Sequence, residues 1–474
     1  MKSQPTIVVI GAGPAGLAAG YELVKNGYKV IIFEKEDLVG GIAKTIEYKG
    51  YRFDLGGHRF FTKNKEVMDI WKSMLKENFL KVKRMSRIYY ANKFFFYPIK
   101  LSNVLINLGP KESVRIITSW MYSQLFPQLP EDTFEKWVTN RFGKRLFQIF
   151  FKTYTEKVWG IPCDKISSDW AEQRIRGLSL LSVVKNSIFK TKNRRGKIKT
   201  LIEEFYYPIM GPGMMWDTFW KFIEDNGGKI VFNTSVENLI IEKDKVKAVK
   251  IMDKINNKSE EIECDFVISS MPLKELILKM TPSVESKIIK IANSLSYRSF
   301  LIVSLIIDKK EVFPDNWIYI HSPEVKVGRI QNFKNWSLKM VPDINKTCLG
   351  LEYFCSEGDT LWNSNDEILF EIAKEEIEKL KFARKTEIID YKVVKVPKAY
   401  PVYDTKYKEN IEVIKNYLKP ISNLQTVGRG GMHRYNNQDH SMLSGMFAAR
   451  NILGENYNIW AINADAEYLE EEKI

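Results

Sequence analysis

The sequence feature that most constrains the fold is a glycine-rich turn between an apolar strand and an apolar helix. Residues 7–10 are β-branched and aliphatic, glycines follow at 11, 13 and 16, and residues 17–23 continue with helical spacing. Gly11 suits the turn, Gly13 lets the backbone approach a pyrophosphate, and Gly16 lets the helix pack closely on the strand. A second strand, residues 29–33, ends in an acid about 20 residues further on, where a carboxylate accepts hydrogen bonds from an adenosine ribose. The pattern predicts a Rossmann-type dinucleotide site, against the alternative of a tight turn without a ligand. Its predicted residues are Gly11, Gly13, Pro14, Ala15, Gly16 and Glu34.

Two further glycine turns follow that a basic Rossmann unit does not need. Lys35 is soon followed by Gly40-Gly41, and a stretch beginning at residue 50 ends in Gly56-Gly57-His58. With these motifs the chain resembles a large flavoprotein superfamily of amine oxidases, protoporphyrinogen oxidases, phytoene desaturases and UDP-galactopyranose mutases. The resemblance implies that FAD is the cofactor, with its pyrophosphate at the first glycines and its flavin ring bordered by the later ones.

A second flavin motif lies near the C-terminus. A strand ends in Gly428-Arg429, and a helix beginning near Asp439 directs apolar residues inward. Free N–H groups and the positive end of a helix dipole stabilise a reduced, anionic flavin. In the alternative interpretation, Asp439 only caps the helix. The resemblance extends the predicted cofactor site to Lys35, Gly41, Gly56, Gly57, His58, Val236, Gly428, Arg429, Asp439, His440, Ser441 and Met442.

The pattern of elements along the chain predicts an α/β fold with a discontinuous, Rossmann-like FAD-binding domain. Residues 65–199 are mostly helical in pattern, whereas strands return near residue 229 and again at 301–307 and 347–354. We therefore assign 1–64, 200–284 and 396–474 to the FAD-binding domain. Residues 65–199 are assigned to a helical insertion, and 285–395 to a substrate-side antiparallel sheet.

Several strings resemble the UDP-galactopyranose mutases more than the amine oxidases. They are Gly56-Gly57-His58, residues 157–162 with 172–174, residues 205–216, residues 399–403 and residues 435–441. By this resemblance Trp159 lies beside a uridine, and arginine and tyrosine side chains bind its diphosphate. The implied catalytic residues are His58, Arg174, Tyr400 and Tyr435, and the implied substrate-binding residues are Trp159, Arg174, Arg298, Tyr400, Tyr435 and Asn437. Trp159 as a core residue and Arg174 in a surface ion pair are alternatives that the sequence leaves open.

The chain also departs from the mutase pattern. Thr155 stands where the mutases place an asparagine, and the stretch from Tyr435 to Asn437 is two residues shorter than its counterpart. After Ile307 no match follows for a second diphosphate-binding arginine. Arg298 or Arg329 is a candidate replacement from the substrate-side sheet. These departures leave the sugar and the nucleotide open.

The mutase resemblance implies covalent catalysis by a cofactor. In that family N5 of reduced FAD attacks the anomeric carbon, the nucleotide diphosphate leaves, and the sugar ring opens and recloses between pyranose and furanose. Arginine and phenolic donors stabilise the departing diphosphate. NAD(P)H or another reductant would supply the reduced form. The leading hypothesis is such a flavin-dependent isomerase, acting in cell-surface polysaccharide biosynthesis.

Two other classes of function remain open. One is an FAD-dependent oxidase or desaturase of an amine, a porphyrinogen or a polyene, and the other is a non-catalytic flavin-binding scaffold. A polyene site should be apolar and an amine site should show facing aromatic rings at N5, whereas a mutase needs substrate-side groups that bind anions. His58 and the paired tyrosines argue against the scaffold.

Composition limits location and partners. The 474-residue chain has a net charge of +14, no apolar stretch of about 18 residues and no signal-like segment before its first strand, so we expect a cytoplasmic protein. A basic tract at 185–199 is expected to guide a nucleotide diphosphate or to contact anionic lipid weakly, unless it is only a solvated surface. The sequence shows no nucleic-acid module, and its four cysteines have no disulfide or metal-ligand spacing. An oligomer is left open.

Overall fold

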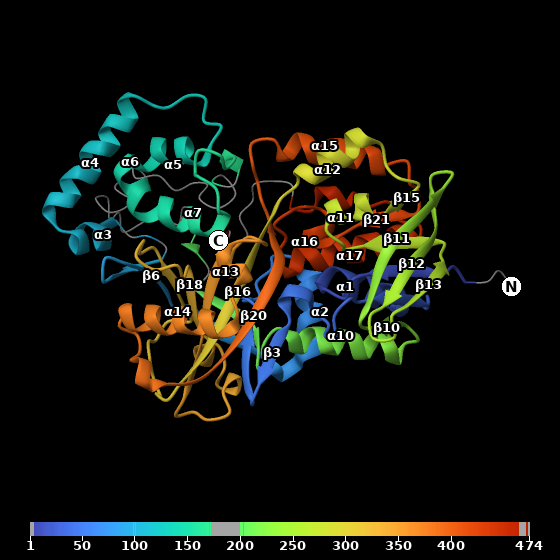
Figure 1. The fold of residues 1–474 in the computed structure, drawn as a ribbon, viewed down its shortest axis with the longest axis horizontal. Helices are drawn as coiled ribbons and strands as arrows, with labels where there is room; N and C mark the ends of the chain where they lie inside the picture. The colour runs from blue at the N-terminus through green and yellow to red at the C-terminus, as the bar shows by residue number, and fades with distance from the viewer. Residues whose placement is uncertain are drawn as a thin grey trace.

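A computed structural model describes residues 4–97, 99, 101–169, 171, 200–201, 203–463 and 471–472. Figure 1 shows a Rossmann-type unit on the right, a group of helices at the upper left and a large sheet at the lower left. Arg174 and the basic tract at 185–199 lie outside the described residues. Their predicted roles therefore stay predictions.

A five-stranded parallel sheet forms the centre of the Rossmann-type unit. Its order is β10 (Lys229–Val231), β2 (Val30–Phe33), β1 (Ile7–Ile10), β14 (Phe266–Ser269) and β21 (Leu424–Thr426). One face packs on α1 (Pro14–Lys25), α10 (Gly213–Asp225) and α17 (Gln438–Ile452), with α2 (Lys65–Leu75) beside α10. The strand, turn and helix predicted at 7–23 are present, and the sheet is assembled from three separate parts of the chain.

The other face of this sheet is covered by a second, four-stranded sheet and by helices. The strand order is β13 (Lys258–Glu263), β12 (Lys245–Asp253), β11 (Thr234–Glu242) and β15 (Met280–Thr281), antiparallel except for the parallel pair of β11 and β15. The helices are α11 (Leu273–Leu278), α12 (Ser286–Ser294) and α15 (Tyr407–Leu418). Ile7 and Val9 of β1 belong to one core and Val8 and Ile10 to the other, as alternation along a strand requires.

The predicted substrate-side sheet has seven strands and is mixed rather than purely antiparallel. Its order is β20 (Ile388–Pro401), β16 (Tyr297–Ile307), β19 (Thr347–Cys355), β18 (Arg329–Asn332), β17 (Trp317–Ile320), β6 (Ser86–Tyr90) and β7 (Lys93–Phe96). The pair of β6 and β17 is parallel, and the other pairs are antiparallel. Two strands of this sheet, β6 and β7, come from the segment that was assigned to the helical insertion. Their aromatic and β-branched residues favour a strand, because such side chains pack well on a pleated, half-buried surface. The proposed boundary at residue 396 falls inside β20.

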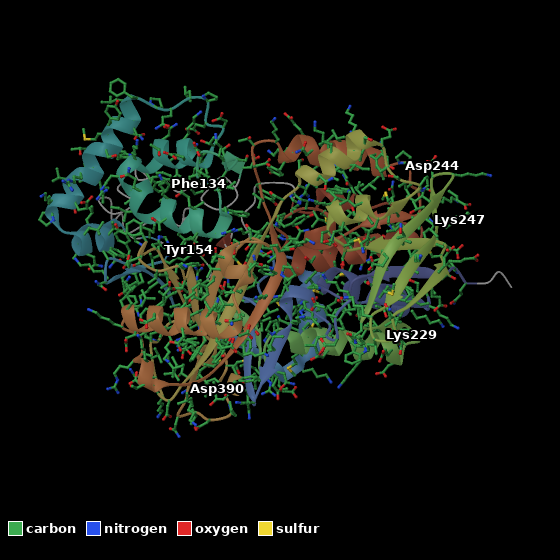
Figure 2. All side chains as sticks on the ribbon, in the orientation of Figure 1. Phe134, Tyr154, Lys229, Asp244, Lys247 and Asp390 are labelled. Carbon is green, nitrogen blue, oxygen red and sulfur yellow. The ribbon has the colours of Figure 1, made fainter. Side chains whose placement is uncertain are left out.

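Helices cover both faces of the seven-stranded sheet. On one side lie α3 (Leu101–Leu108), α4 (Pro110–Leu125), α5 (Phe134–Phe142), α6 (Lys144–Phe147), the π-helical turn η3 (Gln148–Lys152) and α7 (Thr153–Trp159). On the other side lies α14 (Asp366–Lys379). The side chains of Phe134 and Tyr154 come from the first group, above the sheet in the view of Figure 2. The helical prediction therefore fits residues 101–159 but not the strands before them.

Short elements complete the described chain. The paired strands are β3 (Thr45–Tyr48) with β4 (Tyr51–Asp54), β5 (Phe79–Lys83) with β9 (Glu204–Pro208), and β8 (Thr200–Leu201) with β22 (Glu471–Glu472). The short helical turns are η1 (Gly41–Ala43), η2 (Lys76–Asn78), η4 (Phe333–Asn335), η5 (Leu338–Met340), α13 (Thr360–Asn363), η6 (Lys385–Glu387), α16 (Gly428–Gly431) and η7 (Ile459–Ala461). All four cysteines are buried free thiols.

Within the described ranges, no helix combines the length and apolar character needed to cross a bilayer. The same residues contain no group of three or more side chains able to hold a metal ion.

Candidate active site

The first glycine turn has the geometry that a dinucleotide site needs. Gly11 has φ +93°, a conformation that favours glycine, and a Cβ on Gly16 would lie 1.9 Å from the carbonyl oxygen of Gly11. A Cβ on Gly13 would meet nothing closer than Gly41 Cα at 3.9 Å. Gly13 therefore borders open space at the start of α1, where N–H groups and the helix dipole attract an anion.

Glu34 lies at the end of β2, beside this turn. Its carboxylate accepts the Ala12 N–H at 2.7 Å and the Glu36 N–H at 3.0 Å. Burial raises the pKa of Glu34, and these two hydrogen bonds oppose the effect. Because a carboxylate has about four acceptor positions, Glu34 keeps lone pairs for the ribose hydroxyls that the sequence predicts.

One cavity joins the predicted cofactor residues to the predicted substrate residues. Its volume of about 670 Å³ lies within the range of cofactor and ligand pockets. From the predicted cofactor set it is lined by Gly11, Gly13, Pro14, Ala15, Glu34, Lys35, Gly41, Gly56, Gly57, His58, Val236, Gly428, Arg429, Asp439 and Ser441. From the predicted substrate set it is lined by Trp159, Tyr400, Tyr435 and Asn437.

Three predicted cofactor residues do not line the cavity. Gly16 lies in the contact between α1 and the first turn. Nδ1 of His440 accepts the backbone N–H of Asn437 at 3.3 Å, so this ring caps its own helix. Met442 is fully buried, and its sulfur accepts the indole N–H of Trp71 at 3.0 Å. His440 and Met442 therefore hold α17 in place instead of facing a ligand.

Arg298 is also absent from the lining, contrary to the prediction that it binds substrate. Its guanidinium donates to the carbonyl oxygens of Val158 at 3.2 Å and Phe354 at 3.1 Å, and to Oγ of Ser356. A Cβ on Gly160 would lie 2.5 Å from Cζ of Arg298, so glycine is required there. Arg298 thus fixes the end of α7, immediately after Trp159.

The predicted flavin loop, Gly56-Gly57-His58, lies next to the start of α17. Gly56 has φ +103°, and Nε2 of Gln438 donates to the carbonyl oxygen of His58 at 3.4 Å. Burial lowers the pKa of His58 to about 3, with a further contribution from the positive charges of Arg429 and Arg329. The imidazole is therefore neutral at physiological pH.

Three buried polar atoms around this loop find no hydrogen-bond partner among the described residues. They are Nδ1 of His58, Oε1 of Gln438 and Oδ1 of Asp439, and all three residues line the cavity. A buried polar atom without a partner is costly, so such a cluster indicates a polar ligand.

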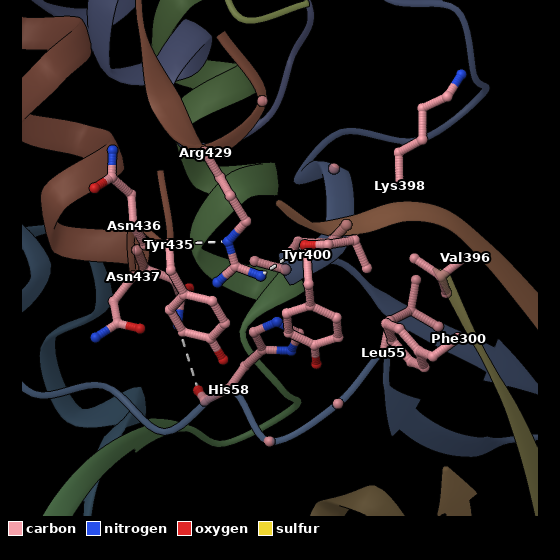
Figure 3. Close-up of a pocket in the computed structure, with 18 of the residues that line it drawn as sticks. Leu55, His58, Phe300, Val396, Lys398, Tyr400, Arg429, Tyr435, Asn436 and Asn437 are labelled. Carbon is pink, nitrogen blue, oxygen red and sulfur yellow. Dashed lines mark hydrogen bonds between the residues drawn. The ribbon is translucent and has the colours of Figure 1, made fainter. Parts of the chain in front are cut away.

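Two tyrosines and an arginine form the next part of the cavity. The rings of Tyr400 and Tyr435 have centroids 5.6 Å apart and planes 10° apart. Cζ of Arg429 lies 4.6 Å from the centroid of Tyr435, and its guanidinium donates to the carbonyl oxygens of Asn436 and Ala399. Figure 3 shows these side chains together with His58. Burial raises the pKa of Tyr400, which keeps its O–H as a donor.

A buried ion pair faces the flavin loop from the seven-stranded sheet. Arg329 of β18 donates through Nε and Nη2 to the two carboxylate oxygens of Glu352, at 2.9 and 2.6 Å. Gln331 donates to the same carboxylate at 2.8 Å. The Glu352 side chain is fully buried, whereas the Arg329 side chain is 17% exposed. Arg329 also lines the cavity. Of the two candidate arginines, the structure brings Arg329 to the site.

A stacked pair that the sequence did not predict lies beside this arginine. Tyr154 of α7 and His321, just after β17, have ring centroids 4.9 Å apart and planes 9° apart. Lys157 binds the loop that carries His321, because its ammonium donates to the carbonyl oxygens of Ser322 and Val327. Burial lowers the pKa of His321 to about 3, with a smaller effect of Lys157.

Beyond these polar groups the cavity continues as an apolar extension among the helices. We call it the aromatic arm, and it is lined by Phe134, Phe142, Leu146, Phe150 and Phe151. These side chains come from α5, α6 and η3. The sequence pattern predicted that this region is helical but did not indicate that one face borders a cavity.

Comparison with known proteins agrees with this architecture. Residues 9–74 match the family model of the NAD(P)-binding Rossmann-like domain. A 4,4'-diapophytoene desaturase (4,4'-diapolycopene-forming) from Methylomonas sp is 23% identical over 320 residues, which are 60% of this chain and 58% of that protein. A probable UDP-galactopyranose mutase from Klebsiella pneumoniae is 27% identical over 168 residues, which are 34% of this chain and 42% of that protein. The chain thus spans less than two thirds of the length of either relative.

The fold is a mixed α/β arrangement of a Rossmann-type domain, helices and several sheets, which confirms the predicted α/β class. Among solved structures of this type, a reduced UDP-galactopyranose mutase is similar to the chain with a TM-score of 0.84. That similarity covers 98% of this chain and 99% of the mutase, at 22% sequence identity. It is a likeness of fold across the whole chain.

Proposed function

We propose that this protein is an FAD-dependent nucleotide-sugar mutase that interconverts the pyranose and furanose forms of a sugar. The observation that carries the proposal is the polar, cationic character of the cavity beside His58. Arg329, Tyr400 and Tyr435 gather there from three separate segments of the chain, and all three line the cavity. Guanidinium and phenolic donors are the groups that bind a diphosphate.

The residues present fit an FAD. The open space beside Gly13 and the start of α1 suit a pyrophosphate, and Glu34 suits the ribose. The unpaired oxygens of Gln438 and Asp439 are acceptors and suit ring N–H groups of a flavin, and Nδ1 of His58 suits a further ring atom as donor or acceptor. When bound and reduced, FAD supplies the electron pair for exchange at the anomeric carbon.

The chain's own residues are proposed to bind and stabilise the departing diphosphate. The ion pair with Glu352 uses Nε and Nη2 of Arg329, so Nη1 is left for a ligand. Tyr400 and Tyr435 add O–H donors in a site of low dielectric, where charge-assisted hydrogen bonds are strong. His58 lines the same cavity and, because its imidazole is neutral, adds no charge to it.

The geometry of the tyrosine pair argues against an amine oxidase. Two rings that enclose a substrate group need about 7 Å between their planes, because each favourable carbon contact is about 3.5 Å. The centroids of Tyr400 and Tyr435 are only 5.6 Å apart. The two rings contact each other and leave no room for a group between them.

An oxidase or desaturase of an apolar substrate is the second candidate. The aromatic arm favours it, because a polyene needs a long apolar surface. The desaturase relative covers more of this chain than the mutase relative does. In this alternative the arginine and tyrosine cluster would have no ligand to bind.

The test is turnover of a nucleotide sugar by the purified flavoprotein. Under anaerobic conditions, dithionite replaces NAD(P)H or another reductant, and UDP-galactopyranose is the first substrate to try. We expect a furanose product by chromatography from the reduced protein and none from the oxidised protein. Oxygen consumption with an amine, a porphyrinogen or a polyene, without any nucleotide-sugar conversion, would refute the proposal.

Substitution of the two cavity tyrosines tests whether they take part in the proposed reaction. Tyr400→Phe and Tyr435→Phe should each slow conversion and retain the flavin spectrum. Tyr391→Phe is the matched control, because Tyr391 stacks on Phe370 outside the cavity. Equal activity of all three variants would remove the tyrosines from the mechanism.

A further inference from the structure

The solvent side of α4 carries an apolar stripe. Val114, Ile117, Met121 and Leu125 follow one another at intervals of three, four and four residues, which places them on one face of the helix. Their exposed fractions are 60%, 41%, 53% and 73%. A helix that packs only on its own protein directs such a stripe to the core, so this face is built for an external contact.

The apolar surface continues beyond the end of the helix. Phe126 is 62% exposed and Leu129 is 74% exposed. We call the six residues Val114, Ile117, Met121, Leu125, Phe126 and Leu129 the α4 patch. Residues 116–130 contain no charged side chain at all, although 27% of the whole chain is charged. A segment that faced only water would be expected to carry several charges.

The opposite side of α4 is firmly attached to the protein. Ile116 and Ser123 are buried, and a Cβ on Gly143 would lie 2.7 Å from both Cα and N of Trp120. Helix α4 therefore packs at backbone distance on the turn between α5 and α6. Figure 1 shows α4 at the outer edge of the helical group, away from the Rossmann-type unit. The α4 patch is thus a fixed outer surface.

Charge identifies the occupant of this surface. Lys111 and Arg115 are exposed in the first turns of α4, and Glu112 pairs with both Arg115 and Arg145. A second copy of the chain would bring the same net charge of +14 and would be repelled. An anionic lipid surface attracts that charge, and interfacial helices combine basic residues with exposed Trp, Phe and Leu side chains.

We propose that the α4 patch docks on an anionic membrane surface, with α4 lying in the plane of the interface. The apolar side chains enter the boundary between headgroups and acyl chains, and Lys111 and Arg115 contact lipid phosphates. The contact is peripheral, since none of the described helices is long and apolar enough to cross a bilayer. In the sequence, the α4 patch is separate from the basic tract at 185–199.

The test is sedimentation of the full-length flavoprotein with vesicles. Wild-type protein should sediment with phosphatidylcholine vesicles that contain a quarter phosphatidylglycerol, and much less with phosphatidylcholine alone. Met121→Glu/Leu125→Glu should lower the bound fraction at least fivefold. Both side chains are exposed, so folding should be unchanged, as judged by circular dichroism and retained flavin.

The matched control adds the same two charges elsewhere. Ile255→Glu/Ile368→Glu replaces two exposed isoleucines, 73% and 51% accessible, one in the turn between β12 and β13 and one in α14. This variant should bind vesicles like the wild type. Equal binding by the wild type and the Met121/Leu125 variant would overturn the proposal, as would no vesicle binding at all. A wild-type dimer that this variant dissociates, without vesicle binding, would assign the patch to a second copy and also overturn it.

Depth of insertion provides an independent measurement. The four native cysteines are buried, so Leu129→Cys can be labelled selectively with an environment-sensitive fluorophore. We expect a blue shift on adding anionic vesicles, and none for the same label at Ile255→Cys. A shift at position 255 without one at position 129 would place the contact on another face.

Discussion

The strongest prediction concerns the buried pair of Arg329 and Glu352. The Glu352 carboxylate has no exposed surface, and its hydrogen bonds come from the guanidinium and from Gln331. Removing one partner leaves an uncompensated buried charge. We therefore expect Arg329→Met and Glu352→Met each to lower the free energy of unfolding by about 3–5 kcal/mol. The double variant should regain most of that loss, because replacing both members of a buried pair by apolar residues is often nearly neutral.

Substrate binding should respond differently from stability. If Arg329 donates a charge-assisted hydrogen bond to the diphosphate, its loss costs about 1.5–3 kcal/mol, or roughly a 10- to 140-fold weaker affinity for UDP. The double variant should therefore be stable and yet bind UDP poorly. Urea unfolding followed by circular dichroism gives the stability, and calorimetric titration with UDP gives the affinity.

Two results would refute this reasoning. Wild-type affinity for UDP in the stable double variant would show that the guanidinium does not contact the nucleotide. Single variants as stable as the wild type would show that the pair is not held in a low-dielectric environment. Lys392→Met, on the edge strand β20 of the same sheet, is a control for removal of a cation there and should change neither quantity.

Three further predictions concern two glycines, one inside α17 and one at the start of α1, and two buried titratable groups. Gly445→Ala would place a Cβ 1.9 Å from the carbonyl oxygen of Ala15 and should destabilise the protein by about 1–3 kcal/mol in thermal melts. Gly13→Ala, whose Cβ meets no protein atom within 3.8 Å, should leave stability unchanged and weaken FAD binding by about 1–3 kcal/mol, or roughly 5- to 140-fold, in fluorescence titrations. Equal stability losses would contradict the assignment. Burial lowers the pKa of His58 from 6.5 to about 3, so the unfolded chain binds the proton more tightly than the folded protein does. Wild-type stability should therefore fall relative to that of His58→Asn as pH drops below 6.5. Parallel plots of unfolding free energy against pH for the two proteins would contradict the burial of this ring. Burial raises the pKa of Asp54 from 3.8 to about 7, so wild-type stability should fall relative to Asp54→Asn by about 3 kcal/mol as pH rises from 4 to 7. A flat difference between their urea midpoints would show that Asp54 is ionised throughout.

The sequence predicted best what depends on residues close together in the chain. The first glycine turn, its strand and its helix were predictable because Gly11, Gly16 and Glu34 act within one β-turn-α-β segment. The start of α17 was predicted within one residue of its observed first residue, Gln438. The sequence placed both Asp439 and Met442 at the predicted cofactor site. Asp439 does line the cavity, whereas Met442 is directed into the core and contacts Trp71.

What the sequence did not predict depends on pairing between distant strands. Strands β6 and β7 were missed because their place in the sheet comes from pairing with β17, far along the chain. The role of Arg329 became visible only when β18 and β19 placed Glu352 beside it. One signal was present, since Glu352 is the only charged residue in the otherwise apolar stretch 347–355. A lone charge in a buried strand indicates a partner but does not say which.

The close crossing of α1 and α17 has a consequence for motion. Gly445 brings the two helices to backbone contact, and their first residues border opposite ends of the proposed cofactor site. Because this contact leaves no space between the two helices, we expect them and the two ends of the proposed site to move together. We therefore expect an opening that admits a substrate to come from displacement of the seven-stranded sheet and its helices relative to the Rossmann-type unit. Strand β20 lines the cavity at residues 394–400 and leads directly from the sheet towards that unit, which makes the chain beyond Pro401 the place to look for a hinge.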